Sequence, residues 1–162
     1  MPASAPPTGP QAFPTHIPFV EALGMELWSA AGGVTELRLK LDGEHMNSRE
    51  MAHGGVVMAL LDVAMAQAAR TLHRAGEAAG PGVTTIEMKT SFLRPSAGTL
   101  YAKGQVLHRT ASMAFCEATV RDDTGAACAH ATGTFKYMRP VLVPEPARVS
   151  ATATKTTDES TP

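Results

Sequence analysis

The stretch MNSREMAHGGVVMALLDVAMAQAAR, residues 46–70, decides the fold. Across residues 54–69 only Asp62 and Gln67 interrupt a run of apolar and small residues, and Asp62 is its one charge. Because alanine, leucine and methionine are strong helix formers, the run predicts a helix from residue 55 to about 74. A helix that is apolar on all sides must also be covered on all sides. The stretch therefore predicts a buried helix that carries one unexplained carboxylate.

Shorter segments around this helix predict a second helix and a set of strands. Residues 16–24 (HIPFVEALG) predict a short helix that ends at Gly24, and residues 25–41 predict two strands joined at 31–33. Four strands are expected after the long helix, over residues 83–95, 99–109, 112–123 and 126–138. Their joins, 96–98, 110–111 and 124–125, are of hairpin length, so we expect consecutive strands to pair antiparallel in a meander. The order predicts an α+β fold with the sheet on one side of the helix and a second subunit over the rest.

The composition fits one domain without a strong charge. Of the 162 residues, 44% are hydrophobic, and the net charge of -1 gives no overall attraction to nucleic acid or an anionic membrane. The two cysteines match neither a disulfide framework nor a metal spacing. A signal peptide and a membrane-length apolar run are both missing from the sequence, so we expect a cytoplasmic protein. Proline-rich ends predict disordered tails at 1–16 and 140–162 around a folded body at 17–139.

Three features of the long helix and the loop before it suggest chemistry on a carbonyl group. The N–H groups of Gly54 and Gly55 begin the helix without intrahelical acceptors and suit an oxyanion, although a glycine pair can also be a simple loop-to-helix break. Burial of Asp62 would raise its pKa toward that of a useful base, or the carboxylate could bond a serine or threonine structurally. The Asn47 amide could hold a carbonyl or a water, or cap its own loop.

The spacing of these groups favours a site shared between two subunits. Gly54 and Asp62 are eight positions apart, which is about 12 Å along a helix. One acyl carbon cannot touch both within one chain. Two such helices laid antiparallel across a two-fold axis would bring Gly54 of one subunit to Asp62 of the other. We therefore expect a composite site and an obligatory dimer.

The same residues resemble the hotdog-fold thioesterases of the PaaI-like, phenylacetate-degradation group. The resemblance covers roughly residues 24–138. It depends on Asn47, His53-Gly54-Gly55 and Asp62 at their spacing, with residues 84–95 and 125–135 similar to two strands of the family. It implies a long central helix wrapped by an antiparallel sheet, and subunits that form active sites at their interface. It further implies metal-free hydrolysis of acyl-CoA thioesters, an EC 3.1.2-type activity in which CoA is part of the substrate and no cofactor is needed.

The family's catalytic roles carry over to this chain by position. The Gly54 N–H and Asn47 would bind the thioester carbonyl. Asp62 of the partner chain would be the nucleophile or the general base for water. A Ser or Thr on the strand after the helix commonly assists in this family, and here Thr85 matches, with Thr84 as the alternative.

Other residues are expected to bind the substrate without taking part in the reaction. They are His53 and Gly55 at the helix start, Lys89, Arg94 and Arg109 as cations for the CoA phosphates, and Met113, Phe115 and Met58 as lining for the acyl group. His53 would shape the start of the helix rather than transfer protons. Each cation could equally be a solvated strand end, and each apolar residue part of the core.

Competing functions have weaker support in the sequence. Hotdog hydratases have a different pattern, in which an Asp and a His are five positions apart. Here the residue five positions after Asp62 is Gln67, which disfavours a hydratase. A non-catalytic acyl-CoA sensor would need an output segment, such as a DNA-binding helix-turn-helix, which no segment supplies. His45 and His53 lack partners at metal-ligand spacing. The expected assembly is a homodimer, with dimers pairing into tetramers.

Overall fold

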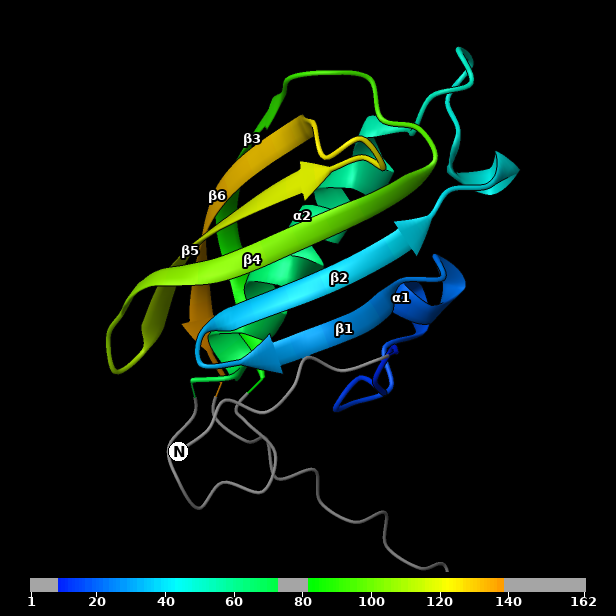
Figure 1. The fold of residues 1–162 in the computed structure, drawn as a ribbon. Helices are drawn as coiled ribbons and strands as arrows, with labels where there is room; N and C mark the ends of the chain where they lie inside the picture. The colour runs from blue at the N-terminus through cyan, green and yellow to red at the C-terminus, as the bar shows by residue number, and fades with distance from the viewer. Residues whose placement is uncertain (1–8, 73–81, 139–162) are drawn as a thin grey trace, which may run out of the picture.

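A computed structural model describes residues 9–72 and 82–138, so the expected tail at 140–162 and the first eight residues of the expected tail at 1–16 lie outside the described residues. The elements are α1 (Pro18–Ala22), β1 (Glu26–Ala31), β2 (Val34–Lys40), a 3-10 turn η1 (Gly43–His45), α2 (Gly54–Arg70), β3 (Val83–Phe92), β4 (Thr99–Arg109), β5 (Met113–Arg121) and β6 (Ala127–Tyr137) (Figure 1). The expected helices and strands are therefore present, although α2 ends four residues earlier than predicted. Within the described residues, no helix combines the length and apolarity needed to cross a membrane.

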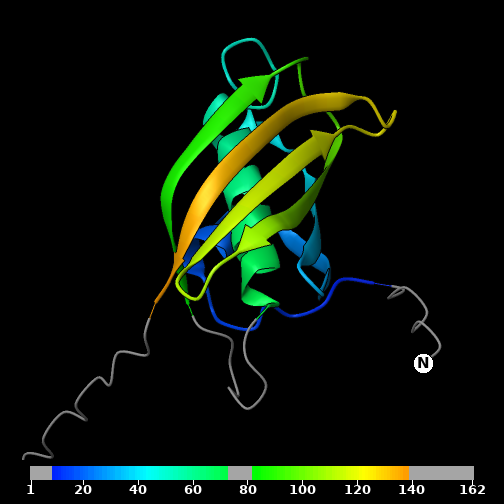
Figure 2. The ribbon, with the colours of Figure 1, turned by 90° about the vertical axis from the view of Figure 1, so that its left-hand side faces the viewer.

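The six strands form one antiparallel sheet in the order β1-β2-β4-β5-β6-β3. Helix α2 lies along one side of this sheet (Figures 1 and 2). Strand β3 is an edge strand of the sheet and lies next to β6. The predicted α+β class, with one long helix against an antiparallel sheet, is confirmed. This topology brings β3, which directly follows α2 in the described sequence, beside β6, the last strand of the described residues.

The predicted meander is wrong at one join, because β3 pairs with β6 and β4 pairs with β2 and β5. The intervening residues 93–98 form a crossing connection instead of a hairpin. The N–H groups of Leu93 and Arg94 donate to the Cys128 carbonyl, while the carbonyl of Ser96 accepts from Ala52 N–H at 2.9 Å. These bonds hold the connection across the end of the sheet, beside the loop that precedes α2.

The core lies between α2 and the sheet. Alternate residues of the strands are buried against the helix, among them Leu37, Leu39, Leu100, Ala102, Ala114, Cys116, Val120 and Phe135. The closest approach is at Gly104 of β4, where an added Cβ would lie 2.5 Å from the Ala64 carbonyl carbon and 2.9 Å from Met65 N. A glycine here lets the sheet touch the helix backbone directly.

The sheet does not cover α2 completely. Gly55 and Met58 are exposed, and Ala59, Asp62 and Ala66 are half-buried, at the spacing of one helical face. We call these five residues the open stripe. The neighbouring strand β3 has no fully buried position and pairs on one side only. A single chain therefore leaves the expected all-round burial of the helix incomplete.

Part of the tail expected to be disordered is placed in the structure. Gln11 forms an isolated antiparallel bridge with Leu27, donating its N–H to the Leu27 carbonyl at 2.7 Å. Thr15 Oγ1 accepts from Arg70 Nη1 at 3.1 Å, which ties this segment to the end of α2. Residues 9–16 thus depart from the expectation of disorder, whereas the wider domain boundaries stay a prediction.

Candidate active site

Asp62 meets Thr85 between α2 and β3. The Thr85 hydroxyl donates to Asp62 Oδ1 at 2.7 Å. Asp62 stands midway along α2 within the open stripe, so its carboxylate lies near the surface that the sheet leaves uncovered. Two of the residues expected to be catalytic therefore form a direct pair within one chain.

The surroundings of Asp62 make its carboxyl group more basic than usual. Burial raises the pKa of Asp62, and the hydrogen bond from Thr85 partly offsets the rise by stabilising the charged form. Because a general base works best with a pKa near the working pH, this direction suits proton abstraction. The shift fits a functional carboxylate better than a purely structural one.

A β-bulge in β3 selects Thr85 over the alternative, Thr84. Thr85 lies opposite the buried Phe135 of β6 and faces α2, whereas Thr84 lies opposite the exposed Lys136 and faces away. The register shifts between Thr85 and Glu87, so Ile86 is an extra residue in the strand. The structure thus gives Thr84 no direct access to Asp62.

The start of α2 has one occupied and one open N–H group. His53 is the N-cap, and its Nδ1 accepts from Gly55 N–H at 3.0 Å. Neither α2 nor its cap supplies an acceptor for the Gly54 N–H. His53 therefore shapes the helix start as predicted, and it removes the Gly55 N–H from the groups that could bind a carbonyl.

Asn47 lies in a small loop that its own side chain braces. Its Oδ1 accepts from Arg49 N–H at 2.8 Å and more weakly from Met51 N–H at 3.4 Å. With the oxygen engaged in this way, the side-chain NH₂ group is oriented away from those two backbone groups. Asn47 thus caps its loop and still has donors for a carbonyl, so the two interpretations of this residue are compatible.

The expected phosphate-binding cations do not gather in one chain. Lys89, on β3, and Arg94, just after it, are exposed and lie on the part of the sheet that leads to the start of α2. Arg109, at the end of β4, lies instead 5.1 Å from the Tyr137 ring, and Tyr137 bonds the Ala69 carbonyl near the end of α2. Within one subunit, Arg109 is therefore at the opposite end of the helix.

The residues expected to line an acyl pocket are also divided. Met58 is 38% exposed within the open stripe of α2. Met113 and Phe115 alternate on β5 with the buried Ala114 and Cys116, so they face away from α2. Within one chain, an acyl group next to Asp62 would meet Met58 and would not meet the two β5 residues.

Phe92 is a site residue that the sequence reasoning missed. A Cβ added to Gly54 would lie 3.4 Å from Phe92 Cζ, so this ring stands beside the open N–H group. Phe92 is seven residues after Thr85, and simple alternation would place the two on opposite faces of the strand. The extra residue at Ile86 reverses that parity. An aromatic residue at the end of β3 was the only signal in the sequence.

The geometry gives each chain two separate half-sites. One is the pair Asp62–Thr85, and the other comprises Gly54 and Asn47 near the start of α2, whose N–H and NH₂ groups are the donors expected to bind a carbonyl. Two surface grooves, with volumes of about 290 and 140 Å³, lie over β1, β2, β4 and β5, and none of these site residues lines them. Among the described residues, no group of three or more His, Cys, Asp or Glu side chains is placed to hold a metal ion.

Comparisons with known proteins agree with this architecture. A family model described as the thioesterase superfamily matches residues 50–129. Among solved structures, the conserved protein PA5202 from Pseudomonas aeruginosa is 28% identical, with a TM-score of 0.71, and the match covers 77% of this chain and 97% of that one. The PaaI protein from the phenylacetic acid degradation operon of E. coli is 21% identical, with a TM-score of 0.68 and coverage of 75% and 84%.

A third solved structure, the thioesterase HI1161 from Haemophilus influenzae, is 20% identical, with a TM-score of 0.67 and coverage of 74% and 82%. A comparison with curated protein sequences gives no match. The matched residues 50–129 include the start of α2, Asp62 and Thr85. The chain therefore has the hotdog fold, and its match to the thioesterase superfamily over residues 50–129 agrees with the PaaI-like resemblance of its sequence.

Proposed function

We propose that this protein hydrolyses acyl-CoA thioesters to a free acid and CoA. The match of residues 50–129 to the thioesterase superfamily supports thioester hydrolysis in general. The observation that carries the proposal is the Thr85–Asp62 hydrogen bond of 2.7 Å at a carboxylate of raised pKa, on the uncovered face of α2. A carboxylate held in this way can accept a proton from water or attack an acyl carbon.

In the proposed reaction, the Gly54 N–H and the Asn47 NH₂ group donate to the thioester carbonyl oxygen. Both donors stabilise the negative charge that develops there when the carbonyl carbon is attacked. With Asp62 as general base, the carboxylate takes a proton from water, the oxygen of that water bonds to carbon, and the C–S bond breaks. The CoA thiolate then takes up the proton. With Asp62 as nucleophile, its carboxylate oxygen bonds to the acyl carbon, the C–S bond breaks and CoA leaves as a thiolate. Water then cleaves the resulting anhydride to the free acid and the Asp62 carboxylate, and its released proton goes to the thiolate.

A second copy of the chain is needed to bring the two half-sites together. Helix α2 and the edge strand β3 lie side by side (Figure 2), and both leave residues exposed. Their exposed apolar side chains include Phe92 at 55%, Ile86 at 51% and Met58 at 38%. A long, exposed and partly apolar edge strand favours pairing with another chain. A two-fold dimer over this surface would place Asp62 of one chain opposite Gly54 of the other.

Complementation between two inactive variants tests this shared site. Asp62→Asn and Asn47→Ala, each expressed alone, should be nearly inactive. When the two are co-expressed, every heterodimer should contain one intact site, and about a quarter of wild-type activity should return for random pairing. Activity is measured as CoA release at equal total protein. If no activity returns although native mass spectrometry shows heterodimers, each site lies within one chain and the composite arrangement is wrong.

The hydrogen bond from Thr85 should appear in the pH–rate profile. Because this bond lowers the pKa of Asp62, Thr85→Val should raise that pKa further. Activity is lost when the Asp62 carboxylate is protonated, so the acidic limb of kcat/KM should move to higher pH. Thr134→Val is the matched control, because Thr134 donates to Glu87 at the same distance of 2.7 Å. An unmoved acidic limb in Thr85→Val would show that Asp62 does not govern it.

The proposed activity itself is tested with purified protein and a panel of aryl, arylacetyl, short-chain and medium-chain acyl-CoA thioesters. A thiol-reactive dye reports free CoA, and calorimetry reports binding. Catalytic release of CoA from at least one thioester is the expected result. Tight binding of an acyl-CoA without release would instead identify a binding protein that does not hydrolyse its ligand, and would refute the proposal.

A further inference from the structure

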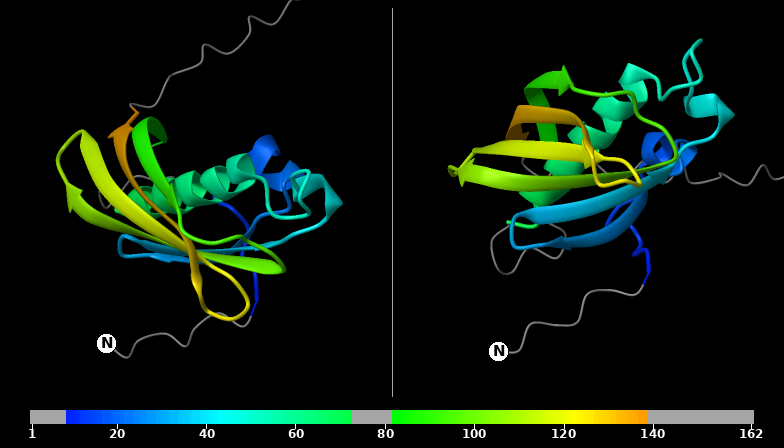
Figure 3. Two further views of the ribbon diagram at one scale, coloured as in Figure 1. Left: turned by 90° about the horizontal axis from the view of Figure 1, so that it is seen from above. Right: turned by 45° about the horizontal axis from the view of Figure 1, so that its top comes forward.

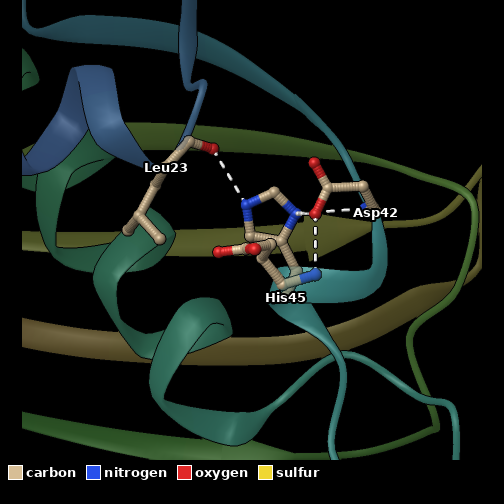
Figure 4. Close-up of polar contacts among 4 residues, drawn as sticks. Leu23, Asp42 and His45 are labelled. Carbon is tan, nitrogen blue, oxygen red and sulfur yellow. Dashed lines mark hydrogen bonds and ion pairs between the residues drawn. The ribbon is translucent and has the colours of Figure 1, made fainter.

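A buried histidine joins three segments at one end of the fold. The His45 side chain is 5% exposed. Its Nε2–H can donate to the Leu23 carbonyl at 3.1 Å, and its Nδ1 lies 3.1 Å from Asp42 N and 3.0 Å from Asp42 Oδ1 (Figure 4). Since a carbonyl can only accept, the Leu23 contact places a proton on Nε2 and leaves Nδ1 to accept the Asp42 N–H in the neutral ring. His45 thereby fixes the end of α1 to the start of η1.

The backbone of His45 extends this link to the start of α2. Its carbonyl accepts from His53 N–H at 2.8 Å, and His53 is the N-cap of α2. Met46 and Ala52 form an isolated antiparallel bridge immediately beside this bond. The segment between them is therefore a small closed loop whose two ends meet at His45. Asn47 lies within that loop. Gly54 directly follows His53, whose N–H group forms the bond that closes the loop.

Few side chains between residues 42 and 53 hold the loop against the rest of the protein. Between residues 42 and 53, only His45 and Ala52 are buried. Ala52 donates to the Ser96 carbonyl at 2.9 Å, which fixes one end of the loop to the crossing connection. The loop otherwise projects beyond the end of the sheet (Figure 3). The half-buried Met46 also packs against the core. His45 is thus the one buried polar side chain that attaches the segment presenting Asn47.

We propose that His45 is a positioning residue for the thioester carbonyl. It sets the place of the Asn47 NH₂ group relative to the Gly54 N–H, and so determines whether both donors can reach one oxygen. The inference rests on the proposed hydrolysis, because it concerns the same two donors. It adds a residue that touches neither the substrate nor the reacting atoms. Small displacements of such donors affect the transition state strongly, because the donors work by being held in place beforehand.

Two substitutions each remove one of the two hydrogen bonds of the His45 side chain and keep the other. An asparagine oxygen can take the place of Nδ1, so His45→Asn keeps the Asp42 bond and loses the Leu23 bond. A glutamine NH₂ group can take the place of Nε2–H, so His45→Gln keeps the Leu23 bond and loses the Asp42 bond. Glu44→Gln, an exposed change in the same 3-10 turn, is the matched control.

The experiment measures kcat and KM for the thioester that the wild-type protein hydrolyses fastest, together with the fraction folded. Both His45 variants should remain folded and lose kcat by roughly 10- to 100-fold, with KM changed by about twofold or less, because the donors act mainly in the transition state. Glu44→Gln should match the wild type. Adding Asn47→Ala to His45→Asn should cost little more than Asn47→Ala alone, because both changes act on one donor.

The outcomes separate this inference from the proposed function. If the wild-type protein hydrolyses no thioester, the proposed function is wrong and the inference falls with it. If the wild type is active and Asp62→Asn is not, but both His45 variants keep full kcat, only the inference is wrong. Independent, fully multiplicative losses in the double variant, or a loss of kcat equal to the unfolded fraction, would likewise overturn the positioning role.

Discussion

Asp62→Asn is expected to lower kcat for thioester hydrolysis by about 10³-fold, within the range that general bases contribute. Asparagine has nearly the same size as aspartate and can still accept a hydrogen bond from Thr85, so the local packing should survive. It cannot take a proton from water or form an anhydride. The measurement is steady-state CoA release, with size-exclusion chromatography to compare the assembly of the two proteins. Near-normal turnover by Asp62→Asn would remove the carboxylate from the mechanism.

A matched control exists on the other face of the same strand. Glu87 accepts a hydrogen bond from Thr134 at 2.7 Å, as Asp62 does from Thr85. Glu87 lies on β3 opposite the half-buried Thr134 and faces away from α2. Glu87→Gln should therefore leave kcat unchanged. A comparable loss in both variants would point to damage in β3 rather than to lost catalysis.

Thermal unfolding provides a further check on Asp62→Asn. Because burial raises the pKa of Asp62, the folded protein binds this proton more tightly than the unfolded chain does. The resulting stabilisation is complete below the unfolded pKa and is lost as pH rises through the folded pKa. Above the folded pKa, the ionised carboxylate therefore lowers the free energy of unfolding. Near neutral pH, Asp62→Asn should accordingly unfold at an equal or higher temperature. A clearly lower midpoint would mean that the carboxylate has a structural role.

Gly104→Val is expected to destabilise the fold by about 3 kcal/mol or more, at the upper end of overpacking effects. The new Cβ would meet the Ala64 carbonyl group and Met65 N, which are backbone atoms of α2 and cannot rotate away. The helix would have to move off the sheet, and Leu60, Ala64 and Ala68 would lose contact with it. Denaturant unfolding of the two proteins measures the difference in free energy.

Gly43→Ala is the control for this substitution. No atom lies within 4 Å of a Cβ added at Gly43, and its φ angle is not in the left-handed region. Alanine should therefore be accommodated in η1 with little change in the free energy of unfolding. If Gly104→Val were as stable as Gly43→Ala, the helix and sheet would not be in the close contact described.

The sequence predicted the elements well because each depends on local pattern. The apolar run over residues 54–69 is typical of a helix that packs against other elements, and Gly24 and residues 31–33 ended their elements at the expected places. The family resemblance singled out both Asp62 and Thr85, and the structure joins them by a hydrogen bond. What local pattern could not give was strand order, because the hydrogen bonds from residues 93 and 94 to Cys128 join segments more than thirty residues apart.

Two features of the site depend on strand geometry and could not be read from local pattern. Counting residues along β3 gives the wrong face for Phe92, because the bulge at Ile86 shifts the alternation by one. Within one chain, Arg109 and Met113 lie far from the start of α2 or on the outer face, so their place in a site shared by two chains stays a prediction. Neither a bulge nor a contact between distant strands leaves a periodic signal in the sequence.

The position of β3 also determines when the Asp62–Thr85 pair can form during synthesis. β3 has one strand neighbour, β6, which ends at Tyr137. Until that last strand has left the ribosome, Thr85 has no partner strand to hold it beside α2, even though Asp62 was made earlier. Strand pairing over such a long sequence separation is a late step in folding. We therefore expect the carboxylate–hydroxyl pair to form only after β6, the last strand of the described residues, has been made.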